Sequence, residues 1–382
     1  MTVRTVGVEE ELLLVDPDTR EPAHRAAEVL KILRDEASGG TSGRGTAADD
    51  VDRELFRHQL ETRTDPATDL ADIRTQLVAA RRTAGTAARR AGLAAVASGT
   101  SPLATTAVRV SRDQRYQTMS DTFGAVASSG GTCGMHVHVA VESDDEGVVV
   151  LDRIGPWLPV LLAMSSNSPY ADGLDTGHAS WRAQLWGRWP SAGPLSPVGS
   201  VAAYRELADE LIGLGAALDT GMLYFDARLS EAHPTVEVRV CDVATDVEHA
   251  CLVAALVRGL VERAAAAPDP RVEGWRPELL RAAHWRASRH GLASTLAHPV
   301  TRRPAPAAEV VAALVAHVEP ALVEAGDLDL VRSGVDRLLA GGGGAARQRA
   351  AYERSGTLEH VVDDLVARTE QTWERIEESG PG

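Results

Sequence analysis

The chain has 382 residues, of which 44% are apolar, and these values are typical of one large or two ordinary packed domains. Its formal net charge of −15 disfavours nucleic acid and acidic membrane surfaces as partners, because both carry negative charge. The longest apolar stretches are broken by charges or prolines, and residues 1–15 lack the pattern of a signal peptide, so we expect a cytoplasmic protein.

The cysteines and the single lysine exclude two further classes of site. Cys133, Cys241 and Cys251 contain no CxxC pair and are odd in number, which argues against a disulfide framework and a thiolate zinc site. Lys31 is the only lysine, and arginine supplies all other basic side chains. A P-loop needs the lysine of GxxxxGK[ST], so that route to ATP binding is closed.

Four short stretches alternate with period two, which predicts strands with an apolar face and a polar face. They are residues 5–15, 55–62, 136–141 and 236–241. The first strand also carries Glu10 on its apolar face. The polar faces carry, in chain order, Glu9 and Glu11; Arg57, Gln59 and Glu61; His136 and His138; and Glu237 and Arg239.

Helices are predicted between these strands and after them. The predicted ranges are 69–92, 201–218, 249–267 and 307–325, followed by a clear amphipathic helix whose apolar stripe runs from Leu358 to Ile376. The stretches 38–46 and 341–344 are predicted to be flexible connections, because neither lies between a strand and the start of a helix.

This order of elements predicts an α+β fold with a largely antiparallel, curved sheet. One face of the sheet is open and catalytic, and helices pack on the other face. We expect a single catalytic domain over residues 1–382, with C-terminal helices in residues 307–378 packed on it.

If the four strands share a sheet, several acidic and imidazole side chains meet on its open face. Two carboxylates about 4 Å apart repel by about 4 kcal/mol at an effective dielectric near 20, so such a group requires cations. Each short motif alone is more often a solvated face or a surface ion pair, and only the combination predicts a site. We predict a cluster of Mg²⁺ ions, with Mn²⁺ as the alternative, among Glu9, Glu11, Glu61, His136, His138 and Glu237.

The chain also contains a series of motifs that together resemble one family. They are GVEEEL from Gly7, ETRTDP from Glu61, SGTSP from Ser98, QRYQ from Gln114, GMHVHV from Gly134, HASWRAQLWGRWP from His178 and TVEVRVCD from Thr235. With these motifs the chain resembles the carboxylate-amine ligases, also called type 2 glutamate-cysteine ligases, whose fold is glutamine synthetase-like. The likeness extends to residues 285–292. The family commonly has histidine where this chain has Ser101.

The resemblance implies a role for each matching position. Glu9 and Glu11 would hold magnesium, and Glu61 would complete a metal shell. Glu237 would bridge metals, and Arg239 would contact the γ-phosphate of ATP, both as catalytic residues. His136 would stand at the metal nearer the nucleotide, with His138 beside it. The amino-acid substrate would be gripped by Ser180 and Arg182, in a funnel lined by Arg115 and Tyr116.

The implied activity is ATP-dependent amide formation through an acyl phosphate, with Mg²⁺ as cofactor. Phosphorylation gives a carboxylate the leaving group that it lacks, and metals plus an arginine suit phosphoryl transfer. The expected substrates are the γ-carboxylate of glutamate and an amine such as cysteine. Two alternatives remain open: a metal-dependent amide hydrolase, and a ligase-like binding protein without turnover. A homodimer is possible through an open sheet edge.

Overall fold

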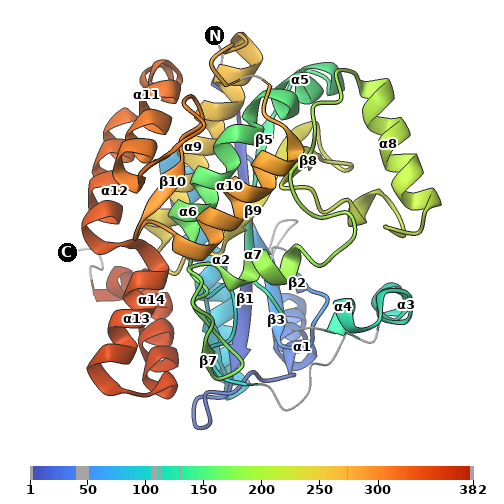
Figure 1. The fold of residues 1–382 in the computed structure, drawn as a ribbon. Helices are drawn as coiled ribbons and strands as arrows, with labels where there is room; N and C mark the ends of the chain where they lie inside the picture. The colour runs from blue at the N-terminus through green and yellow to red at the C-terminus, as the bar shows by residue number, and fades with distance from the viewer. Residues whose placement is uncertain are drawn as a thin grey trace.

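The computed structural model describes residues 3–39, 51–104, 111, 113–128, 131–272 and 274–378 (Figure 1). Its centre is a seven-stranded sheet in which every strand pairing is antiparallel. The strand order is β2 (Val51–Arg53), β3 (Gln59–Arg63), β1 (Val6–Val15), β5 (Gly134–Ala140), β9 (Thr235–Asp242) and β8 (Ala227–Leu229), and β4 (Ala94–Val96) pairs with β1 outside this path. This sheet, with helices around it, confirms the predicted α+β class.

Three of the four predicted strands form almost as expected, and the fourth is shorter. The predicted strand 55–62 was wrong in its first half, because Phe56 and Gln59 are joined by a turn and β3 begins only at Gln59. The side chain of Gln59 is buried and is therefore not available to a ligand on the open face. Its amide donates hydrogen bonds to the Thr132 carbonyl at 2.7 Å and to Cys133 Sγ at 3.3 Å.

Helices cover the other face of the sheet because their apolar residues pack onto those of the strands. The main contacts come from α2 (Leu70–Arg90), α5 (Asp144–Ile154), α6 (Leu158–Ser165) and α9 (Val247–Ala266). α9 is buried over most of its surface and forms the centre of this layer.

The helical stretch Asp144–Ser165 is long and apolar enough to cross a membrane, but 78% of its most apolar window is buried inside the fold. Such burial is typical of a core helix.

Four C-terminal helices stack along one side of the molecule (Figure 1). They are α11 (Ala307–Ala325), α12 (Leu328–Gly341), α13 (Gly343–Ser355) and α14 (Leu358–Glu378), whereas α10 (Pro277–His290) lies nearer the centre of the view and packs on α6. α11 packs on α9, and α14 packs on α2, where Trp373 lies so close to Gly85 that a Cβ there would be 2.6 Å from the indole ring. The apolar stripe predicted for the last helix is buried at Val361, Val362, Leu365 and Trp373.

The glycine stretch 341–344 was wrongly predicted to be a flexible connection. It is a tight junction between α12 and α13, in which Gly342 and Gly343 have φ values of 69° and 78° that glycine adopts at little cost. Gly344 packs against Asn167, and an added Cβ would lie 2.3 Å from the amide oxygen. The predicted connection 38–46 lies mostly outside the described residues.

The remaining elements are short or peripheral. The predicted helix 201–218 is confirmed as α8 (Val201–Gly213), which ends five residues early. The others are α1 (Ala26–Gly39), α3 (Gln114–Phe123), α4 (Ala125–Ser128), η1 (Gly155–Trp157), β6 (Tyr170–Ala171), β7 (Leu174–Asp175), α7 (Trp181–Trp186), η2 (Thr220–Met222), β10 (Thr295–Ala297) and β11 (Pro304–Pro306).

A buried ion pair fixes β1 against the helix layer. Glu10 points away from the open face, and both of its oxygens accept hydrogen bonds from Arg81 of α2, at 2.8 and 2.6 Å. Arg81 also donates to the carbonyls of Ala244 and Thr245, just before α9. Both side chains of the pair are fully buried. One guanidinium therefore holds together β1, α2 and the connection from β9 to α9.

We predict that Glu10→Gln lowers the free energy of unfolding by about 3–5 kcal/mol, because it leaves the buried Arg81 charge without its partner. Glu319→Gln is the matched control: its partner Arg332 lies at 3.1 Å, and both side chains are exposed. The control should cost at most about 1 kcal/mol. Urea unfolding of both variants measures the difference, and equal costs would contradict the importance of the buried pair.

Candidate active site

The register of the sheet places the predicted functional side chains in one row across five strands. Glu11 lies opposite Glu61 of β3, and Glu9 lies opposite His136 of β5. The row continues where His138 pairs with Glu237 of β9, and Glu237 in turn pairs with Arg228 of β8. Because paired residues in antiparallel strands point to the same face, these side chains all reach the open face.

The row forms the floor of a pocket of about 350 Å³. Nine of the eleven predicted site residues line it: Glu9, Glu11, Glu61, Arg115, Tyr116, His136, His138, Glu237 and Arg239. A second cavity of about 650 Å³, which shares Glu61, Arg115 and Tyr116 with the first, continues it beyond β3. Sequence reasoning missed several lining residues, among them Glu54, Trp186, Tyr224, Arg228, Glu231 and His233.

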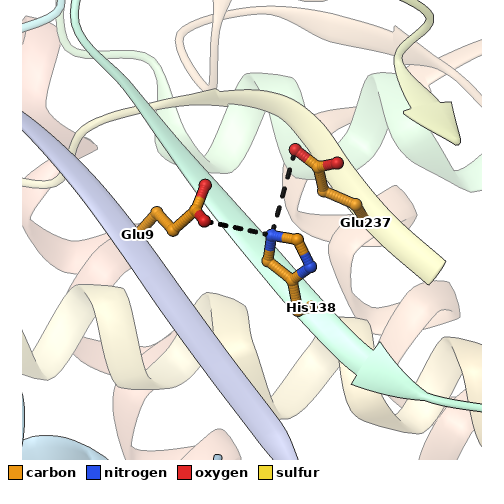
Figure 2. Close-up of side chains that lie close together, drawn as sticks. All are labelled: Glu9, His138 and Glu237. Carbon is orange, nitrogen blue, oxygen red and sulfur yellow. Dashed lines mark ion pairs between the residues drawn. The ribbon is translucent and has the colours of Figure 1, made fainter. Parts of the chain in front are cut away.

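Glu9 lies at the centre of a group of imidazoles and carboxylates. Figure 2 shows His138 Nε2 between the carboxylates of Glu9 and Glu237, at 3.5 and 3.9 Å. His136 Nδ1 lies 3.1 Å from Glu9 Oε2. Burial alone would raise the pKa of Glu9, but the hydrogen bond from His136 and the neighbouring His138 imidazole outweigh it and lower that pKa well below its usual range. Glu9 is therefore ionised at neutral pH.

The arrangement of these groups fits divalent metal ions. Three sets of side chains each place one ligand atom per residue within 4.8 Å of the others: Glu9, His138 and Glu237; Glu9, Glu61 and His136; and Glu11, Glu54 and Glu61. The Nε2 atoms of His136 and His138 are buried and have no hydrogen-bond partner. Burial, followed by the nearby Arg239 charge, lowers the pKa of His136, so this ring is neutral and able to coordinate. Carboxylates with one or two imidazoles suit Mg²⁺ or Mn²⁺.

Glu54 joins Glu11 and Glu61 as the third carboxylate of one candidate metal set. Burial, followed by the charge of Glu11, raises the pKa of Glu54 to about 7. The same kind of burial and the neighbouring Glu54 charge raise the pKa of Glu61. Glu54 lies in the connection between β2 and β3, where no period-two pattern marks it. Only its position beside β3 shows that it belongs to the site.

Glu237 is held between two arginines. Arg228 Nε donates to Glu237 Oε2 at 2.7 Å, and Arg239 contacts the other oxygen. Burial would raise the pKa of Glu237, but the charges of Arg239 and Arg228 outweigh it and lower that pKa strongly. The β9 end of the pocket therefore combines an ionised carboxylate with two cations, whereas the β3 end brings together the carboxylates of Glu11, Glu54 and Glu61.

Ser180 and Arg182 do not line this pocket, which differs from the predicted position of a substrate grip. Ser180 is fully buried and donates to Asp242 Oδ1 at 2.7 Å, while it also caps α7. Arg182 is 1% exposed, and its guanidinium donates to the carbonyls of Arg239 and Val240. Their hydrogen bonds to the protein interior assign both residues to the layer beneath the site.

Arg115 and Tyr116 lie at the rim, on the first turn of α3. Arg115 pairs with Asp219, whose Oδ1 is 2.9 Å from Nη2, so the pair links α3 to the segment before η2.

Ser101, in contrast, bonds locally to the carbonyl of Leu103 and does not line the pocket. Burial raises the pKa of Cys241 to about 12, so this thiol is not a thiolate at neutral pH.

Comparison with known proteins identifies the family. The model for glutamate-cysteine ligase family 2 matches residues 5–364. The chain belongs to this family. It is 58% identical over 374 residues to "Putative glutamate--cysteine ligase 2-1" of Nocardioides sp. (strain ATCC BAA-499 / JS614), covering 97% of each chain. It is 46% identical over 373 residues to a protein of the same name from Streptomyces avermitilis, covering 96% of this chain and 100% of the relative.

Membership in this family confirms the predicted enzyme class, a carbon–nitrogen ligase of the glutamate–cysteine ligase type. Two solved structures share the fold. A glutamate–cysteine ligase from Francisella tularensis has a TM-score of 0.69 at 13% identity, covering 98% of this chain and 90% of that chain. A bifunctional glutathione synthetase from Pasteurella multocida has a TM-score of 0.68 at 15% identity, covering 98% of this chain and 53% of that chain.

We predict that the stability of the metal-free protein depends on pH and that Glu54 contributes to this dependence. Between pH 4.5 and 7 the folded protein keeps the Glu54 proton that the unfolded chain loses, so stability falls by roughly 1–3 kcal/mol as pH rises. Mg²⁺ should reverse this trend, because the deprotonated carboxylates bind it. Thermal unfolding at several pH values, with EDTA or with Mg²⁺, tests both statements.

Glu54→Gln should flatten this pH dependence and weaken the stabilisation by Mg²⁺. Glu21→Gln, at an exposed position outside the pocket, is the matched control and should leave both unchanged. A Glu54→Gln variant with the pH profile of the parent would contradict the raised pKa of Glu54.

Proposed function

We propose that the protein is an ATP- and Mg²⁺-dependent ligase that joins the γ-carboxylate of glutamate to the amine of cysteine through an acyl phosphate. The observation that carries this proposal is the row of carboxylates and imidazoles on one sheet face, with arginines at one end. Bound divalent ions would neutralise these carboxylates and screen the charge of a nucleotide triphosphate. The proposal also rests on family membership and on the names of the relatives.

The two ends of the pocket differ in charge, which suggests different tasks for them. At the β9 end, Arg239 and Arg228 provide positive charge beside Glu237. We assign Arg239 to the transferring γ-phosphate, where developing negative charge needs a fixed cation. His136, near this end, belongs to the metal shell on the nucleotide side. An AMP complex of the Francisella tularensis ligase agrees with a nucleotide site in this fold.

At the other end, we assign Glu11, Glu54 and Glu61 to a metal that orients the substrate carboxylate. Arg115 and Tyr116 line both cavities at this end, so they are placed to contact the amino acid. An arginine can bind a carboxylate through two parallel hydrogen bonds, although Arg115 would first have to release Asp219.

We further propose that residues 1–382 act as one catalytic unit, since α11 and α14 pack directly on helices of the sheet layer. The cytoplasmic location stays a prediction from the sequence. A homodimer stays a prediction.

The decisive experiment measures ADP release by the purified protein with ATP, Mg²⁺ and pairs of amino acids, followed by mass measurement of the conjugate. We expect ADP only when glutamate and an amine are both present, with cysteine preferred. A different amine would revise the substrate and retain the ligase reaction. Amide cleavage without nucleotide would support a metal-dependent hydrolase instead. ATP and Mg²⁺ binding in calorimetry, without turnover with any pair, would support the binding protein.

We predict that Glu237→Gln lowers ATP turnover by at least roughly 10²-fold, because a neutral amide can neither bridge cations nor hold two arginines. Circular dichroism checks that the variant is folded. Glu142→Gln, at an exposed position just after β5, is the matched control and should retain the parent rate. Full activity of a folded Glu237→Gln protein would remove Glu237 from the metal site.

A further inference from the structure

The guanidinium of Arg239 is buried but has few polar partners. Its side chain contacts Glu237 through Nη1, whereas Nε is buried without a hydrogen-bond acceptor. Glu237 is also the partner of Arg228, and its Oε1 atom lies 3.7 Å from His136. Because the Glu237 carboxylate also interacts with Arg228 and lies near His136, it cannot by itself fix the orientation of the Arg239 guanidinium.

Two aromatic rings supply the missing constraint. The Cζ atom of Arg239 lies 5.8 Å from the ring centroid of Trp186 and 5.9 Å from that of Tyr224. The two rings also contact each other, with centroids 4.5 Å apart and planes inclined by 46°. An aromatic face attracts a guanidinium without using its N–H groups, so the donors remain available for a ligand.

Trp186 is itself fixed from below by Arg182. The Cζ atom of Arg182 lies 5.5 Å from the Trp186 centroid, so two guanidinium groups lie near one indole. Arg182 Nη2 donates to the backbone carbonyl of Arg239 at 3.2 Å. The same strand residue is therefore connected to α7 twice, through its carbonyl and through its side chain. Arg182, although buried, therefore supports both the backbone of Arg239 and the ring of Trp186.

We propose that Trp186 is a positioning residue that aims the Arg239 guanidinium into the pocket, with Tyr224 beside it and Arg182 behind it. This inference rests on the proposed function, because Arg239 matters only if it meets the transferring phosphate. Trp186 acts through Arg239, so its loss should lower kcat, which reports the transition state, more than it raises the KM for the amino acid.

The first test compares Trp186→Phe with Trp186→Leu in the full-length enzyme with Mg²⁺, ATP and its amino acids. We expect Trp186→Leu to lower kcat roughly 10-fold or more, and Trp186→Phe to stay within about 3-fold of the parent, because phenylalanine keeps an aromatic face. Trp181→Leu is the matched control on the same helix, since Trp181 contacts His178 and lines no part of the pocket. Thermal unfolding verifies that each variant is folded.

The second test is chemical rescue. Arg239→Ala should lose activity, and added guanidinium chloride at a nondenaturing concentration should restore part of it when Trp186 is present. The double variant Arg239→Ala with Trp186→Leu should show little or no rescue, because the added guanidinium ion no longer has the indole ring of Trp186 to bind against. Sodium chloride at equal ionic strength is the control.

The outcomes separate this inference from the proposed function. Full activity of Arg239→Ala would overturn the role of Arg239 in the proposed function. Loss of activity in Arg239→Ala with equal rescue in both backgrounds would overturn the role of Trp186. If guanidinium restores neither variant, the single substitutions decide: equal rates for Trp186→Phe and Trp186→Leu would overturn the inference, and an aromatic-dependent rate would support it.

Discussion

Mutual repulsion among carboxylates on one face of an antiparallel sheet is the constraint around which the structure is built. Glu9, Glu11, Glu61 and Glu237 come from three strands, and Glu54 joins them from a connection. Carboxylates at such short range cannot all be ionised without cations among them. The raised pKa of Glu54 and the lowered pKa of Glu237 are two responses to this constraint, by protonation at one end and by arginines at the other.

The opposite face of β1, the strand that carries Glu9 and Glu11, shows how the structure tolerates this repulsion. Glu10 lies between Glu9 and Glu11 in the sequence but is neutralised by a fully buried arginine from the helix layer. That pair, together with the backbone N–H of Gly134, which donates to Glu11 at 2.5 Å, holds β1 in place. A rigid support suits a site in which like charges must be kept close until a cation binds.

The layer beneath the pocket has a comparable role for the cationic end. Arg182 donates to the backbone of β9 and packs against Gly134, where an added Cβ would lie only 2.2 Å from its guanidinium. Asp242, at the end of the same strand, accepts hydrogen bonds from Ser180 and Ser168. Residues predicted to grip a substrate thus belong to the support of β5 and β9, the strands that carry His136 and Arg239.

The sequence by itself determined three strands of the site, β1, β5 and β9, and the faces of their side chains, because a period of two leaves only two directions for each residue. Glu9, His136 and Glu237 were predictable for this reason, and the motifs identified the family. Only the tertiary structure decided what each face meets. Glu54 enters the site from an irregular connection, and Arg182 is turned inward by packing between α7 and β9. Local patterns contain no information on such contacts, because residues distant in sequence create them.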